Sequence, residues 1–125
     1  MARAAKQYRP AHYKPDAKRV DRRESASVRG YDSRWARLRR AYAKAHPLCE
    51  DCLPDPVPVD EVDHIIPIEG VDDPLRLEWR NLRSRCRRCH AIKTARCDDR
   101  IRAEVASGAD WTKVVERWRR KGAGR

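Results

Sequence analysis

Two Cys-x-x-Cys pairs, Cys49/Cys52 and Cys86/Cys89, constrain what this chain can fold into more than any other feature. Structural zinc takes four ligands in a tetrahedron, and two such pairs bring four thiolates around one ion. Zinc binding there closes the 33 residues between the pairs into a loop. Ligation in zinc-finger peptides contributes on the order of 10 kcal/mol. The spacing therefore predicts a structural Zn²⁺ site that stabilises a small core.

The composition agrees with a small core and with thiols that bind metal. The chain has 125 residues, one domain's worth, of which 40% are hydrophobic and 39% charged. Its five cysteines are an odd number, and residues 1–30 contain no apolar run of the kind found in secretory signals. We therefore expect a reducing, cytoplasmic location, where paired cysteines are metal ligands rather than disulfides. No stretch reaches the roughly 20 apolar residues that cross a bilayer, so we expect no membrane contact.

The distribution of charge favours a polyanionic partner. The net charge is +11, which fits nucleic acid first, although an acidic membrane or protein surface would satisfy charge alone. Residues 34–44 and 80–96 carry five and seven Lys or Arg without an acid, and they flank residues 50–78 with ten acids. Residues 1–30 hold nine Lys or Arg, which predicts a basic flexible arm. Such an arm is either a solvated tail or an electrostatic tether to phosphate.

Residue patterns predict an α+β fold. We expect a helix capped by Ser33 that ends before His46-Pro47, because the residue before a proline disfavours helical geometry. A strand is expected within residues 57–66, and residues 83–86 are expected to pair with it. The segment 89–96 should be helical. Residues 98–120 should form two short helices divided at Gly108, the second capped by Asp110, with the apolar stripe Trp111, Val114, Val115 and Trp118 facing the core.

A second set of polar residues lies between and beside the cysteine pairs: Asp63-His64, Asn81 and His90. Together with Ile65-Ile66-Pro67 and Cys86-x-x-Cys89-His90-x-x-Lys93-Thr94, this set resembles the HNH endonucleases. These are nucleases of the ββα-metal (His-Me finger) fold, here in the small four-cysteine type found in bacteriophages and bacteria. The resemblance covers roughly Tyr31 to Arg96, about half of the chain, and includes Tyr31-Asp32-Ser33-Arg34-Trp35 and Pro47-Leu48-Cys49.

The resemblance implies a role for each residue of the set. Asp63 and His90 would bind one catalytic divalent cation, His64 would be the general base, and Asn81 would steady the loop that presents His64. Mg²⁺ or Mn²⁺ is the favoured cation, while an Asp/His pair also accepts nickel, cobalt or zinc. Adjacent residues of a regular strand point to opposite sides, so Asp63 can face the metal while His64 faces the attacking water.

The implied activity is hydrolysis of phosphodiester bonds in double-stranded DNA with low sequence specificity, by nicking or double-strand cleavage, giving 5′-phosphate ends. The expected phosphate contacts are Arg83, Arg85, Arg87, Arg88, Lys93 and Arg96. Phage members of this type often accompany the terminase, so terminase or portal proteins are expected partners in DNA packaging. We expect a monomer or a weak dimer.

Three divisions of the chain follow: an arm over residues 1–30, a nuclease core with its zinc site over 31–97, and a helical extension over 98–125. Two alternatives stay open at this point. His90 could replace a cysteine as a zinc ligand, and the chain could be a non-catalytic zinc ribbon that binds DNA or assists the terminase. Cys97 is interpreted as an ordinary small residue without a chemical role.

Overall fold

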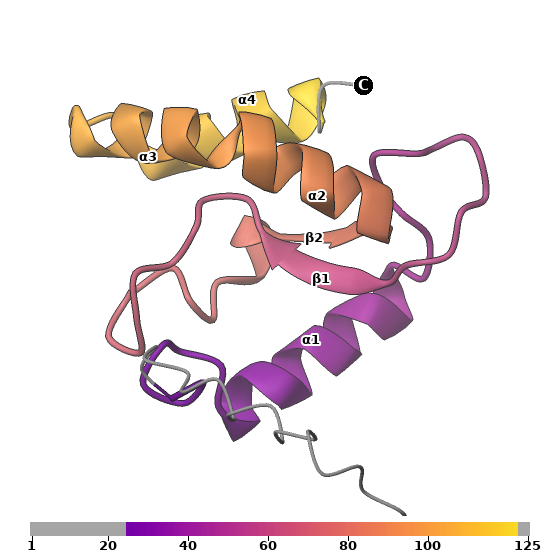
Figure 1. Ribbon diagram of the computed structural model, residues 1–125, viewed down its shortest axis with the longest axis horizontal. Helices are drawn as coiled ribbons and strands as arrows, with labels where there is room; N and C mark the ends of the chain where they lie inside the picture. The colour runs from indigo at the N-terminus through magenta and orange to yellow at the C-terminus, as the bar shows by residue number, and fades with distance from the viewer. Residues whose placement is uncertain (1–24, 123–125) are drawn as a thin grey trace, which may run out of the picture.

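A two-stranded antiparallel sheet lies between one helix on one face and three helices on the other (Figure 1). The computed structural model of the chain describes residues 25–122, so most of the predicted basic arm lies outside the described residues. The elements are α1 (Ser33–Ala45), β1 (Glu61–His64), the short 3₁₀ helix η1 (Trp79–Asn81), β2 (Leu82–Arg85), α2 (Arg87–Arg96), α3 (Asp98–Ala106) and α4 (Trp111–Lys121). This arrangement confirms the predicted α+β class with a ββα core. Over residues 25–122, no helix is both long and apolar enough to span a bilayer.

The N-cap of helix α1 is Asp32, one residue before the predicted cap Ser33. The carboxylate of Asp32, not the hydroxyl of Ser33, accepts hydrogen bonds from the N–H groups of Arg34 and Trp35, each at 3.1 Å. An aspartate cap also complements the positive end of the helix dipole. Trp35 and Tyr42 are buried against Leu82 of β2 and form the core between α1 and the sheet.

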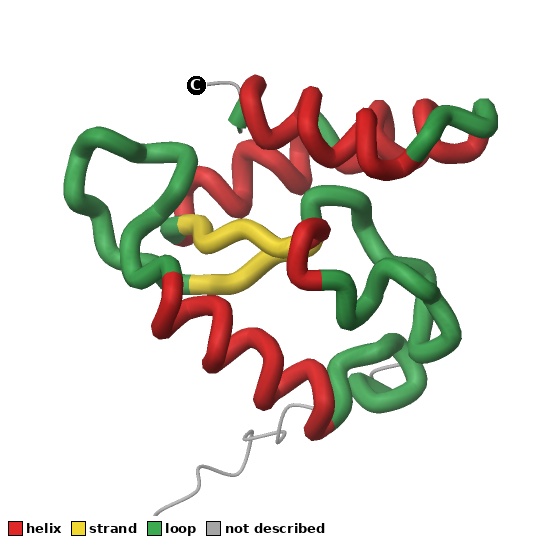
Figure 2. Tube along the Cα trace, turned by 180° about the vertical axis from the view of Figure 1, so that it is seen from behind, coloured by secondary structure: helices red, strands yellow, loops and turns green. Residues whose placement is uncertain are grey.

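The hairpin forms where it was predicted, but β1 is shorter than the expected strand. Its register pairs Glu61 with Arg85 and His64 with Leu82. The proline-rich residues 54–58 before β1 contribute only one isolated bridge, Leu48 with Pro58, because proline cannot donate to a ladder. The long connection from β1 to β2 ends in η1, which lies at one end of the sheet when the molecule is seen from behind (Figure 2).

The last three helices follow the prediction closely. Helices α2 and α3 meet at Cys97, which caps both of them. Gly108 has a φ of +88° in the turn after α3, and the carboxylate of Asp110 caps α4 by accepting from the N–H of Thr112. The predicted stripe faces inward: Val114, Val115 and Trp118 pack with Ile65, Ile66, Cys97 and Ile101 in the largest core cluster, and Trp111 packs at its edge.

Arg76 connects the segment before α1 to the loop after β1. Its buried guanidinium donates to the carbonyl oxygen of Gly30 at 3.2 Å, to that of Val71 at 3.1 Å and to the Asp32 carboxylate at 2.9 Å. Gly30 has a φ of +97°, and a Cβ there would lie 2.7 Å from Cδ of Arg76 and 2.9 Å from Cδ1 of Ile68. A side chain at residue 30 would therefore displace a pinned arginine.

Replacing Gly30 with alanine should destabilise the fold by roughly 2–4 kcal/mol, because left-handed strain and overpacking add. Gly108→Ala is the matched control, since Gly108 has a similar φ of +88° but no heavy atom within 4 Å of the added Cβ. That control should cost only about 1 kcal/mol. Urea unfolding of both variants measures the difference, and equal losses would contradict the close approach of Arg76 to Gly30.

Candidate active site and metal centres

The four cysteines of the two pairs converge as their spacing predicted. Their sulfur atoms all lie within 4.8 Å of one another, and Sγ of Cys52 is 3.8 Å from that of Cys86 and 3.7 Å from that of Cys89. A tetrahedral zinc site with Zn–S bonds of about 2.3 Å needs sulfur atoms about 3.8 Å apart. The four thiols thus suit a structural Zn²⁺, and His90 is not needed as a ligand.

The local backbone explains why these thiols meet. Cys52 donates its N–H to the carbonyl oxygen of Cys49 at 3.2 Å, which folds the first pair into a tight turn, and the N–H of Cys49 donates to the carbonyl oxygen of Val57 at 2.7 Å. Cys86 caps α2, and its sulfur accepts the N–H of Cys89 at 3.5 Å. Burial raises the pKa of the Cys86 thiol, but the Cys89 N–H and the neighbouring thiols outweigh burial and lower that pKa to about 7. A lowered pKa favours the thiolate, which is the form that binds metal.

The second predicted site lies in a groove of about 330 Å³ along β1. Asp63, His64 and His90 all line it, so residues far apart in the sequence come together there. The remaining lining residues come from α1 and the segment before it and from β1: Tyr31, Trp35, Arg39, Glu61 and Val62. In Figure 1 this strand lies between α1 and α2. Helix α1 lines the groove with Trp35 and Arg39, and α2 lines it with His90.

His64 is held from two directions. Its ring stacks on Trp35 of α1, with 4.3 Å between ring centroids, and its Nε2 lies 2.9 Å from the carbonyl oxygen of Arg76. Because a carbonyl oxygen only accepts, Nε2 carries the proton in the neutral ring, and Nδ1 keeps the lone pair. Burial lowers the pKa of His64 below the usual 6.5, against the opposing effect of that hydrogen bond. The ring is therefore neutral at pH 7 and able to accept a proton.

Asn81 continues the strand pairing beyond His64. Its side-chain oxygen accepts the N–H of Ile66 at 2.8 Å, and its amide nitrogen donates to the carbonyl oxygens of Ile66 and Leu75 at 3.1 and 3.3 Å. Its backbone carbonyl accepts the N–H of Ile65 at 2.8 Å. The fully buried amide thus fixes the residues that follow His64.

Asp63 and His90 face each other across the groove. Oδ1 of Asp63 lies 3.7 Å from Nε2 of His90, while Nδ1 of His90 lies 2.7 Å from a carboxylate oxygen of Glu61. Two ligands of one divalent cation, each about 2.1 Å from it, can lie up to about 4 Å apart. The separation is too long for a hydrogen bond but suits two ligands of one ion, and Glu61 orients the ring by its other nitrogen as metal-bound histidines require.

The second oxygen of Asp63 is held by charge. Oδ2 lies 3.0 Å from Nζ of Lys93 and 3.2 Å from Nε of Arg85, both buried cations. Neither contact has the angles of a hydrogen bond, so Oδ2 and the Arg85 Nε are buried polar atoms held by electrostatic attraction alone. The carboxylate is therefore oriented with Oδ1 toward His90. As expected for adjacent strand residues, Asp63 faces α2 while His64 faces α1.

Three of the six expected phosphate contacts lie inside the protein instead. Arg83 and Arg85 both donate to the buried carboxylate of Asp51, the Arg83 contact measuring 2.6 Å. Lys93 is only 2% exposed. A buried, ion-paired cation cannot reach a phosphate without losing its partner. The other three, Arg87, Arg88 and Arg96, are exposed on α2.

Several residues of the groove were not singled out from the sequence. Glu61 precedes Asp63 by two residues, so the strand period alone places both on one face, and that signal was available. Trp35 lies in a predicted helix and Arg76 in a segment with ten acids, and neither position signals a contact with His64. Their contacts with His64 depend on tertiary packing that no local pattern reveals.

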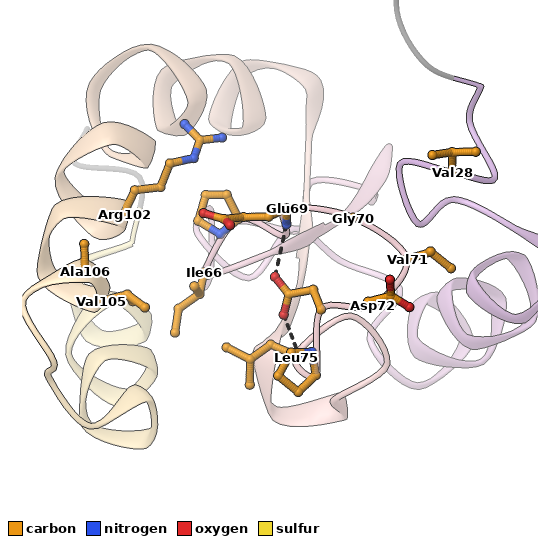
Figure 3. Close-up of a pocket in the computed structure, with 13 residues that line it drawn as sticks. Val28, Ile66, Glu69, Gly70, Val71, Asp72, Leu75, Arg102, Val105 and Ala106 are labelled. Atoms are coloured by element: carbon orange, nitrogen blue, oxygen red, sulfur yellow. Dashed lines mark hydrogen bonds between the residues drawn. The ribbon is translucent and has the colours of Figure 1, made fainter.

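A larger hollow of about 640 Å³ lies between the loop after β1 and α3 (Figure 3). Its floor is apolar, from residues such as Ile66, Leu75 and Val105. The carboxylate of Asp73 accepts the N–H groups of Glu69 and Leu75 at 3.0 and 2.8 Å and so folds the loop. None of the predicted catalytic or metal-binding residues lines this hollow, so its size does not make it the active site.

Comparison with known proteins identifies the same region. Residues 47–96 match the family model described as HNH endonuclease. No curated protein and no solved structure matches the chain. The matched segment contains the four clustered cysteines, the hairpin and α2, and therefore every predicted metal ligand. Over these 50 of its 125 residues the chain is similar to the HNH endonucleases.

Proposed function

We propose that this protein is a metal-dependent DNA endonuclease. The observation that carries the proposal is the convergence of Asp63, His64 and His90 in one groove, with a neutral histidine beside a two-ligand cation site. A zinc ribbon that only bound DNA would have no use for this arrangement. The match of residues 47–96 to the family model supports the nuclease class, and the groove holds residue types that hydrolysis of a phosphodiester needs.

His64 acts as the general base in this proposal. Nδ1 takes a proton from a water molecule, whose oxygen forms a bond to phosphorus while the bond from phosphorus to the 3′ oxygen breaks. The leaving oxygen takes up a proton, which gives 5′-phosphate and 3′-hydroxyl ends. Trp35 and the carbonyl oxygen of Arg76 fix the ring, so the base needs no reorganisation before it acts.

Asp63 and His90 hold the catalytic cation in this proposal. A divalent cation bound there supplies positive charge beside the scissile phosphate and the leaving oxygen. Asp63 presents Oδ1, and Glu61 holds Nδ1 of His90 so that Nε2 faces the same point. Mg²⁺ or Mn²⁺ suits a site with two protein ligands, because both ions keep several waters. Asn81 keeps the loop after His64 in register.

Double-stranded DNA is the proposed substrate, held by exposed cations near the groove. Arg87 lies three residues before His90, on the same face of α2, and Arg39 of α1 lines the groove itself. Arg88 and Arg96 are also exposed on α2. These side chains contact phosphate rather than bases, which agrees with low sequence specificity. Packaging of phage DNA with a terminase remains a prediction from the resemblance.

Replacing His64 with alanine should reduce metal-stimulated nicking of plasmid DNA by about 100-fold or more, because general-base catalysis contributes 10²–10⁴. His46→Ala removes an imidazole outside the groove and should cleave like the wild type. Zinc content and thermal melting of both variants establish that the fold is retained. Equal cleavage by a folded His64→Ala protein would remove His64 as the base, and a wild type that binds DNA without cutting it would favour the zinc-ribbon alternative.

Replacing His90 with alanine should weaken Mn²⁺ binding at least tenfold and leave one zinc per chain, because the four thiols form a separate site. Cys89→Ser should release zinc and also abolish Mn²⁺ binding, since the second site depends on the helix start that zinc fixes. Elemental analysis and calorimetric titration distinguish the two outcomes. Loss of zinc from His90→Ala would mean that the two sites are one.

Replacing Arg87 and Arg88 with alanine should weaken DNA binding and reduce the slope of log K against log salt by about 0.9 for each lost phosphate contact. Lys113→Ala with Arg120→Ala is the matched control, because both residues are exposed on α4, which does not line the groove. Filter binding to a nonspecific duplex at several salt concentrations measures both slopes. An equal change in the control pair would assign the effect to net charge rather than to α2.

A further inference from the structure

We propose that Asp98, which lies outside the family-matched residues, is a positioning residue for the catalytic cation site and acts through Lys93. The inference rests on the proposed function, because it concerns the same site. Asp98 is the first residue of α3, and its Oδ1 lies 2.6 Å from Nζ of Lys93. The same ammonium group donates to the backbone carbonyl of His64 at 2.7 Å and lies 3.0 Å from Oδ2 of Asp63.

The position of Lys93 makes this contact more than a surface ion pair. Its side chain is 2% exposed, and all three of its oxygen partners are either site residues or Asp98. A buried ammonium needs compensation for lost hydration. Two hydrogen bonds, to His64 and Asp98, and the charge of Asp63 supply that compensation and hold Nζ in one place. Asp98 therefore holds the Lys93 ammonium in place, and that ammonium in turn holds Asp63 and the end of β1.

The balance of charge predicts how the contact between Asp98 and Lys93 affects cation affinity. Oδ2 of Asp63 meets two cations, Lys93 and Arg85, and each of these has a second carboxylate partner. Asp51 is shared between Arg85 and Arg83, whereas Asp98 pairs with Lys93. Asp98 thus offsets the charge of Lys93, which leaves more of the negative charge of Asp63 available for a metal ion. Without Asp98 the site gains one positive charge, which repels a divalent cation.

Asp98 is not the N-cap of its own helix. Cys97 caps α3 without a side-chain hydrogen bond, and the Asp98 carboxylate is turned toward Lys93 instead. Asp98 and Asp99 both lie in the first turn, where either would favour the helix dipole. Asp99 is fully exposed and pairs only with Arg102 among the described contacts, at 3.2 Å. It is therefore a matched control that shares the helical effect but not the contact with Lys93.

The test is calorimetric titration of the zinc-loaded, DNA-free protein with MnCl₂. Asp98→Asn should bind Mn²⁺ about tenfold more weakly than the wild type, within the range seen when partners of metal ligands are removed. Asp99→Asn should bind like the wild type, and Asp98→Glu should recover most of the affinity. In a Lys93→Met background, adding Asp98→Asn should change the affinity little, because the lysine that Asp98 compensates is gone.

Wild-type affinity in Asp98→Asn, an equal loss in Asp99→Asn, or an undiminished loss in the Lys93→Met background would each overturn the inference. A role confined to stability would lower the melting temperature of Asp98→Asn without changing Mn²⁺ affinity. If Asp98→Asn loses its zinc or its cooperative melting, the comparison of Lys93→Met with the double variant decides. Mn²⁺ binding without DNA cleavage would refute the proposed function alone, whereas no His90-dependent Mn²⁺ binding in the wild type would refute both.

Discussion

The turn that carries Cys49 and Cys52 packs against Cys86 and Cys89, at the junction of β2 and α2. The geometry of the groove depends on this contact. Cys86 caps α2 and Cys89 lies in its first turn, so the sulfur cluster sets where the helix begins and how it leaves the sheet. His90 follows at once on the same turn. The backbone strengthens the closure, because Glu50 donates its N–H to the carbonyl oxygen of Ser84 at 2.9 Å. The proposed metal ligand on α2, His90, is thus positioned by a cysteine cluster that takes no part in the proposed reaction.

Asp51, between the first two cysteines, extends that closure into the hairpin. Its buried carboxylate receives Arg83 and Arg85, and Arg85 in turn approaches Asp63. A chain of alternating charges therefore runs from the turn between Cys49 and Cys52 to the groove along β1. Buried ion pairs of this kind contribute little net stability, since desolvation opposes their attraction. Their effect here is to fix the direction of one carboxylate, which the strand alone would leave free to rotate.

Sequence patterns were sufficient for the helices, the hairpin and the clustering of the four cysteines, because periodicity, capping residues and ligand spacing are local signals. They failed where the outcome depended on distant partners. Asp32 and Ser33 are both good caps, and only the contact of Asp32 with Arg76, 44 residues away, favours the aspartate. Arg83 and Arg85 resemble phosphate ligands until Asp51, more than 30 residues earlier, is seen to bury them. Lys93 was likewise misjudged, since its partners come from two other elements.

Register explains why the site needs an asparagine at position 81. Asp63 and His64 serve opposite faces of β1, so a slip of one residue would turn the carboxylate toward Trp35 and the imidazole toward α2. The last strand pair, His64 with Leu82, lies at the end of the sheet, where pairing is weakest. Asn81 adds pairing beyond that end, because its amide both accepts from and donates to the backbone of Ile66. An ionised aspartate has nearly the same shape but no donor. It would still accept the N–H of Ile66 but would leave the Ile66 carbonyl without its hydrogen bond from residue 81.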